Sequence, residues 1–73
     1  MDEVQTKITL DSLRAKGYTP HVKSGAVYLY QRGIIIIEII PFLNQINLRE
    51  ESESGGYPKL VKSNIKLFED IYD

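Results

Sequence analysis

Groups that could carry chemistry are scarce in this sequence of 73 residues, which has one histidine, His21, and no cysteine. General-base catalysis needs a titratable group close to the reacting atoms, and nucleophilic catalysis needs a base beside the nucleophile. No such partner lies near His21 in the sequence. The Gly-rich phosphate loop, His-Glu-x-x-His and Gly-x-Ser-x-Gly are all missing. We therefore expect a structural His21, no cofactor, no metal site and no enzyme activity.

Glu38 is the most unusual carboxylate, because it interrupts a run of isoleucines that extends from Ile34 to Ile40. One interpretation is a gatekeeper, since an uncharged run of this kind would be prone to aggregate as β-structure. The other is a recognition residue paired with Arg32, Arg49 or a cation of a partner, since a carboxylate on an apolar face needs a counter-charge or solvent. The two interpretations are compatible, and the sequence leaves both open.

Aromatic and basic residues precede this run, where Tyr28, Tyr30 and Arg32 fall on one side of an expected strand. Tyr and Arg are common at protein interfaces, and tyrosine rings on a sheet can also stack nucleic-acid bases. A third interpretation places the rings in an ordinary core beneath a helix. With a net charge of -1 the chain lacks the strong positive charge of a simple nucleic-acid binder, so nucleic acid is the second choice. The residues that would make such contacts are Arg14, Lys16, Lys23 and Arg32.

The first elements that position these residues are expected between residues 3 and 17. Apolar or threonine side chains alternate there with polar ones, which is typical of a half-buried strand. A helix starting from an Asp2 cap is the alternative, but it would spread the same apolar residues around its circumference. We predict a strand over residues 3–10, then a short helix over 11–16 that is capped by Asp11 and ends at Gly17. The alternating residues are Val4, Thr6, Ile8 and Leu10.

Three further strands are predicted over residues 18–23, 26–31 and 34–40, and the loop between the last two decides which side chains share a face. A two-residue loop at 32–33 places the tyrosines with the isoleucines at 35, 37 and 39. A three-residue loop at 31–33 places Val27 and Leu29 there instead. Because three-residue loops favour glycine at their last position, where Gly33 stands, we predict the three-residue loop. The opposite face then holds Tyr28, Tyr30, Ile34, Ile36, Glu38 and Ile40.

The last third of the chain predicts a strand over residues 45–50, a glycine-rich loop and an amphipathic helix from Pro58 to the C-terminus. A helix, three antiparallel strands and a final helix form an order that resembles double-stranded RNA-binding domains, and the small ribonuclease toxins built on that plan, over residues 11–72. Those toxins carry a histidine soon after a Gly-Ser pair on a central strand. Here Gly25 is followed by Ala26 and Val27, so the ribonuclease expectation lacks its catalytic group.

Together these elements predict a single small α+β domain over residues 1–73, with an antiparallel sheet of three to five strands, a C-terminal amphipathic helix and a short N-terminal helix. One long helix and one short helix are too few to cover both apolar faces of such a sheet, so the remaining face should bind a partner. We predict a non-enzymatic protein-interaction module of the regulator or inhibitor type, which binds another protein and forms a homodimer. The alternative is a nucleic-acid-binding protein. The predicted interface comprises Tyr28, Tyr30, Ile34, Ile36, Glu38 and Ile40.

The sequence also indicates whether to expect a signal peptide or a membrane span. The first 20 residues are polar and lack the continuous apolar segment of a signal peptide. The longest apolar stretch, residues 34–43, is broken by Glu38 and Pro41 and has about half the length of a membrane span. We therefore expect a cytoplasmic protein that does not cross a membrane.

Overall fold

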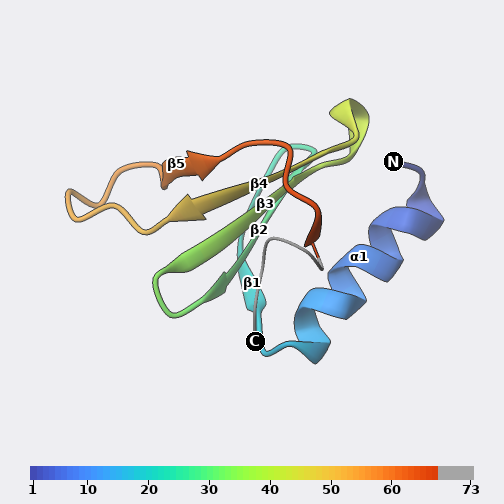
Figure 1. Cartoon of the computed structure of the whole chain (residues 1–73), viewed down its shortest axis with the longest axis horizontal. Coiled ribbons are helices and arrows are strands. Elements are labelled where there is room, and N and C mark those ends of the chain that lie inside the picture. Colours follow the sequence, from blue (N-terminus) through green and yellow to red (C-terminus); the bar gives the residue numbers. More distant parts are fainter. Residues whose placement is uncertain (68–73) are drawn as a thin grey trace.

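The computed structural model describes residues 1–67, which form one N-terminal helix beside a five-stranded antiparallel sheet (Figure 1). The order of the strands in the sheet is their order in the chain, and each strand pairs with the next. An N-terminal helix and an antiparallel sheet of the predicted size are therefore confirmed. The elements are α1 (Glu3–Ala15), β1 (Thr19–Ser24), β2 (Val27–Arg32), β3 (Ile35–Ile40), the 3-10 helix η1 (Pro41–Leu43), β4 (Gln45–Glu50) and β5 (Lys59–Lys62).

Helix α1 replaces the strand predicted over residues 3–10, so that prediction is wrong. The residues that face the sheet lie at helical spacing, since Thr6 and Leu13 are buried and Leu10 packs against the core. Val4 and Ile8 belong to the same alternation and are 67% and 59% exposed. Because half of the alternating residues face solvent, the alternation is no guide to burial here.

Polar residues set the two ends of α1. Asp2 is the N-cap, and its Oδ1 atom accepts a hydrogen bond from the backbone nitrogen of Gln5 at 2.8 Å. Asp11, which was the predicted cap of a shorter helix, lies well inside α1. Gly17 follows the helix with a φ of 88°, the left-handed conformation predicted for it.

The turn between β2 and β3 is a two-residue loop at Gly33 and Ile34, so the predicted three-residue loop is wrong. Arg32 pairs with Ile35, and Gly33 has a φ of 61° at the first loop position, as in a type II′ turn. Like the two-residue loop considered as the alternative, this loop places the tyrosines of β2 on the same face as the isoleucines at 35, 37 and 39. The opposite face includes Leu29, Ile36 and Glu38.

The six residues predicted to form one interaction face are consequently divided between the two sides of the sheet. The two tyrosines lie on the side that α1 covers, and Ile36 and Glu38 lie on the other. Of the six, only Ile34 is exposed, Tyr28 and Ile40 are half-buried, and the remaining three are buried: Tyr30, Ile36 and Glu38.

Strand β5 lies where the C-terminal helix is predicted, so that prediction is wrong over residues 58–66. Ile65 and Leu67 are buried as expected, and Ile65 reaches the core from a segment without regular secondary structure. The rest of the predicted helix, residues 68–73, lies outside the described residues. Within residues 1–66, one α-helix is followed by five strands, whereas the order that resembled RNA-binding domains has three strands after its first helix.

The core fills the space between one face of the sheet and two covering segments, α1 and residues 63–67. Figure 1 shows the red segment after β5 running between the sheet and α1. It is held to β4 by a hydrogen bond from the Ile65 nitrogen to the Ile46 oxygen at 2.8 Å. No helical segment within residues 1–67 has the length and apolar character needed to cross a membrane. The buried cluster comprises Leu13, Tyr18, Tyr30, Ile37, Ile39, Ile65 and Leu67.

Candidate functional site

A groove of about 860 Å³ lies between α1 and the β1–β2 hairpin, and η1 closes one end of it. The helix contributes residues spaced three or four apart, which a helix places in one stripe. The hairpin and η1 form the opposite wall. The lining residues are Met1, Glu3, Thr6, Lys7, Leu10, Asp11, Arg14, Lys23, Gly25, Ala26, Tyr28, Pro41 and Phe42.

Two of the basic side chains in the groove are held over tyrosine rings. The guanidinium carbon of Arg14 lies 5.7 Å from the ring centre of Tyr30, and the Nζ atom of Lys23 lies 5.0 Å from that of Tyr28. A cation over an aromatic face is attracted by the ring quadrupole. The two tyrosines therefore attract two exposed positive charges along the wall of the groove, each by about 0.5 to 1 kcal/mol.

A third basic side chain is paired within the helix. Lys7 donates to the Oδ2 atom of Asp11 at 2.7 Å, one turn further along α1. This hydrogen bond is the main reason that the pKa of Asp11 lies below its ordinary value, with a smaller contribution from the charge of Arg14. Because Lys7 and Asp11 neutralise each other, the positive character of the groove comes mainly from the two cations over tyrosines.

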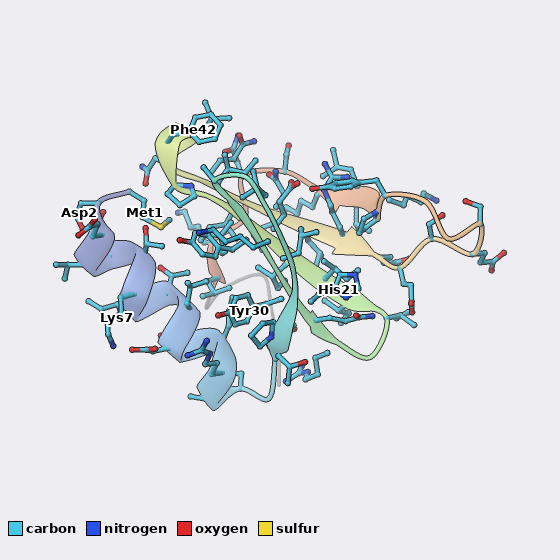
Figure 2. All side chains as sticks on the ribbon, turned by 180° about the vertical axis from the view of Figure 1, so that it is seen from behind. Met1, Asp2, Lys7, His21, Tyr30 and Phe42 are labelled. Atoms are coloured by element: carbon cyan, nitrogen blue, oxygen red, sulfur yellow. The ribbon has the colours of Figure 1, made fainter. Side chains whose placement is uncertain are left out.

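The end of the groove near η1 is apolar. Phe42 is 70% exposed, and Figure 2 shows it projecting from η1 near Met1 and the start of α1. The backbone nitrogen of Met1 donates to the Pro41 oxygen at 2.8 Å, which ties the start of the chain to η1. Beside this contact, a smaller depression of about 210 Å³ is lined in part by Ile8 and Met1. Exposed apolar side chains thus gather where α1 begins.

A second polar cluster surrounds Glu38 on the other face of the sheet. Its Oε1 atom accepts hydrogen bonds from Asn47 Nδ2 at 2.7 Å and Arg49 Nε at 3.0 Å, and its Oε2 atom accepts one from the Tyr57 hydroxyl at 2.6 Å. Burial raises the pKa of Glu38, but these three hydrogen bonds and the charge of Arg49 outweigh it, so the pKa lies below its ordinary value. Burial raises the pKa of Tyr57, and the hydrogen bond to the same carboxylate raises it further.

The Glu38 cluster also fixes the strand beyond it. Arg49 donates through a guanidinium nitrogen to the Pro58 oxygen at 2.7 Å, and its guanidinium lies 5.0 Å from the ring centre of Tyr57. The Asn64 nitrogen donates to Asn47 Oδ1 at 3.1 Å. All three donors to Glu38 belong to this chain, so Glu38 has a structural role. A recognition role for Glu38 stays a prediction, with Arg49 as the partner that the sequence named.

The four cations predicted to contact nucleic acid fall into two pairs. Arg14 and Lys23 line the groove, whereas Lys16 and Arg32 meet at the turn after α1. Arg32 donates to the Lys16 oxygen at 2.6 Å, and its guanidinium lies 4.6 Å from the ring centre of Tyr18. Arg14 and Lys23 therefore lie together at the groove. Arg32 instead binds the backbone at the C-terminal end of α1.

His21 lies apart from both clusters. It is exposed, it sits at the irregularity between Pro20 and Val22 in β1, and Figure 2 shows it on the far side of the sheet from α1. Within residues 1–67, no three His, Asp or Glu side chains gather closely enough to hold a metal ion.

Sequence reasoning missed several residues of the groove, above all Lys7, Asp11 and Phe42. Groove residues on α1 recur every three or four positions between residues 3 and 14, as a helix face requires. This spacing could have identified Lys7 and Asp11, but a strand was predicted there instead. Phe42 follows Pro41 at the end of the isoleucine run and lacks any pattern that would mark it as exposed.

Comparisons of the chain with protein-family models, with curated proteins and with solved structures found no match.

Proposed function

We propose that this chain is a protein-interaction module that binds a segment of a partner protein in the groove beside α1. The observation that carries the proposal is the combination of an exposed Phe42 at one end of the groove with two cations over tyrosine rings, Arg14 and Lys23, along its wall. A binding site of this size usually combines apolar walls with a few placed polar groups. Binding without catalysis is what a regulator or inhibitor needs.

The charges and the apolar end of the groove indicate which kind of partner segment would bind there. A large apolar side chain of the partner would pack on Phe42 and Met1, and a neighbouring carboxylate would approach Arg14 and Lys23. The ring contacts favour positions of both cations along the groove, which lowers the loss of side-chain freedom when they bind an acid. We therefore propose a short partner segment with an aromatic or large aliphatic residue close to Asp or Glu.

Selection from a random peptide library displayed on phage tests this function directly. The wild-type protein should enrich peptides that combine a large apolar residue with an acidic one. Phe42→Ala and Lys23→Glu should each weaken the binding of those peptides at least fivefold, while Ile34→Ala should leave it unchanged. Ile34 is a matched control because it is exposed and apolar but lies in the β2–β3 turn. Failure to enrich any peptide, or equal binding by the Phe42 and Lys23 variants, contradicts the proposal.

Nucleic-acid binding through Arg14 and Lys23 is the competing hypothesis, and it has less support. Tyr30 is buried, so its ring is closed to a base, and the net charge of -1 gives the chain no strong positive charge to attract phosphates. Phosphate contacts release counterions, so such binding would fall steeply with added salt. Labelled single-stranded RNA and duplex DNA titrated at low ionic strength should show no salt-dependent binding. A steep salt dependence that Lys23→Glu removes would favour nucleic acid over a protein partner.

A further inference from the structure

Helix α1 presents three faces that differ in chemistry. The buried face packs on the sheet through Thr6, Leu10 and Leu13. A second face lines the groove and carries every charged residue of the helix, whereas the face that points away from the sheet carries none. The solvent side of a surface helix normally carries charged or polar residues, and here it also carries large apolar ones. The residues of this outer face are Val4, Gln5, Ile8, Thr9, Ser12 and Ala15.

The outer face of α1 loses few hydrogen bonds when it is removed from water. Val4 and Ile8 lie one turn apart and are 67% and 59% exposed. The hydroxyls of Thr9 and Ser12 each donate to a backbone oxygen one turn earlier in the helix at 2.8 Å, so both already have a partner within the chain. Depletion of charged residues distinguishes the centre of a protein interface from the rest of a surface. The outer face of α1 shows the same depletion.

The charges beside the outer face indicate that a second copy of this chain is the partner. They alternate in sign along α1, and their side chains are exposed: Glu3, Lys7, Asp11 and Arg14. If two copies of α1 lie antiparallel about a two-fold axis at the middle of the helix, Glu3 of one copy lies opposite Arg14 of the other. In the same arrangement Lys7 lies opposite Asp11. Every charge then meets its opposite, whereas a parallel pair would place like charges together.

We propose that this chain forms an antiparallel dimer through the outer face of α1, with Ile8 near the two-fold axis and the four charged residues along the rim. A hollow of about 210 Å³, lined in part by Ile8, Thr9 and Asn44, lies beside that axis and can receive an apolar side chain of the second copy. The sheet face predicted for self-association is mostly buried, so the dimer uses a different surface. It also leaves Phe42 and Lys23 free to bind a partner segment in the groove.

Sedimentation velocity of the whole chain over a range of concentrations tests the proposal. A contact made by one helix of 13 residues is small, so the dimer should be weak, with a Kd between about 10 μM and 1 mM. Ile8→Lys places like charges near the axis and should weaken the dimer at least tenfold. Ile34→Lys should leave it unchanged, and it is a matched control because Ile34 is 63% exposed and lies in the β2–β3 turn. A wild-type chain that stays monomeric at about 1 mM, or a dimer that Ile8→Lys weakens no more than Ile34→Lys does, would overturn the proposal.

Exchange of the rim charges distinguishes the antiparallel dimer from other arrangements. Glu3→Lys and Arg14→Glu each place like charges opposite one another twice per dimer, so each should weaken it about fivefold. The double variant Glu3→Lys/Arg14→Glu restores opposite charges and should return the Kd to within about threefold of the wild-type value, which a folding defect could not do. A double variant that dimerises no more tightly than the single variants would show that the antiparallel arrangement is wrong. Lys23→Glu should weaken peptide binding in the groove but leave the dimer unchanged, so the dimer and the proposed function can fail separately.

Discussion

The carboxylate of Glu38 is stabilised on an apolar face of the sheet because it accepts hydrogen bonds from Asn47, Arg49 and Tyr57. A buried charge needs such pairing, and removal of the charge leaves its donors unsatisfied. We predict that Glu38→Gln lowers the free energy of unfolding by about 1 to 3 kcal/mol at neutral pH. Urea denaturation followed by tyrosine fluorescence measures the difference. An unchanged midpoint would show that the cluster contributes nothing to stability.

The same residue predicts how stability depends on pH. The pKa of Glu38 in the folded protein lies below its ordinary value of 4.5, so the folded state favours the ionised form. The resulting stability is fully present above the unfolded-state pKa and is lost as the pH falls through the lower folded-state pKa. The stability gap between wild type and Glu38→Gln should therefore narrow below about pH 4.5. A gap that widens on acidification would contradict this sign.

The residue-scale contacts could be predicted only in part from the sequence. Arg49 was a named candidate partner because its charge is opposite to that of Glu38. Asn47 lies directly across from Glu38 in the β3–β4 register, which becomes known only once the pairing is fixed. Tyr57 reaches the carboxylate from 19 residues further along the chain, and no sequence pattern connects the two.

At the scale of elements, Gly33 controls how β2 meets β3. Its φ of 61° is strained for residues with a Cβ atom, and an added Cβ would meet nothing within 4 Å. The cost of Gly33→Ala is therefore purely a backbone cost, and we predict a loss of about 1 to 2 kcal/mol in the free energy of unfolding. Gly56→Ala is the matched control, because its backbone is not in the left-handed region and its Cβ would meet only Ser54 at 3.8 Å. Thermal unfolding of both variants by circular dichroism checks the difference, and equal losses would contradict it.

The elements also show where sequence patterns succeed. Strands β1 to β4 fall within one residue of their predicted positions, because Gly25, Gly33 and Pro41 mark the ends of the strands between them. Helix α1 was missed because Val4 and Ile8 imitate a strand pattern although both are exposed. Strand β5 was missed because Lys59–Lys62 is short and exposed, and its position depends on the bonds that Arg49 and Asn47 make to its flanks.

At the scale of the whole molecule, the segment after β5 completes the core that α1 begins. Ile65 is 5% exposed in the same cluster as Leu13. Ile65→Ala should cost about 2 to 5 kcal/mol, which is comparable with the whole stability of a domain this small, about 3 to 5 kcal/mol. Leu60→Ala, in exposed β5, should change stability by less than about 0.5 kcal/mol. Urea denaturation of the two variants makes the comparison, and a stable Ile65 variant would show that the segment is dispensable.

The packing of Ile65 and Leu67 in one cluster with Leu13 and Tyr18 has a consequence for the order of folding. The strands pair in chain order, so each hairpin joins residues that are close together in the sequence. Ile65 and Leu13 are far apart in the chain, and closing a long loop costs more conformational entropy than closing a short one. Contacts between distant residues also form more slowly than local ones. We therefore expect the hairpins to form before residues 63–67 dock, and the apolar face of the sheet to stay open to water until they do.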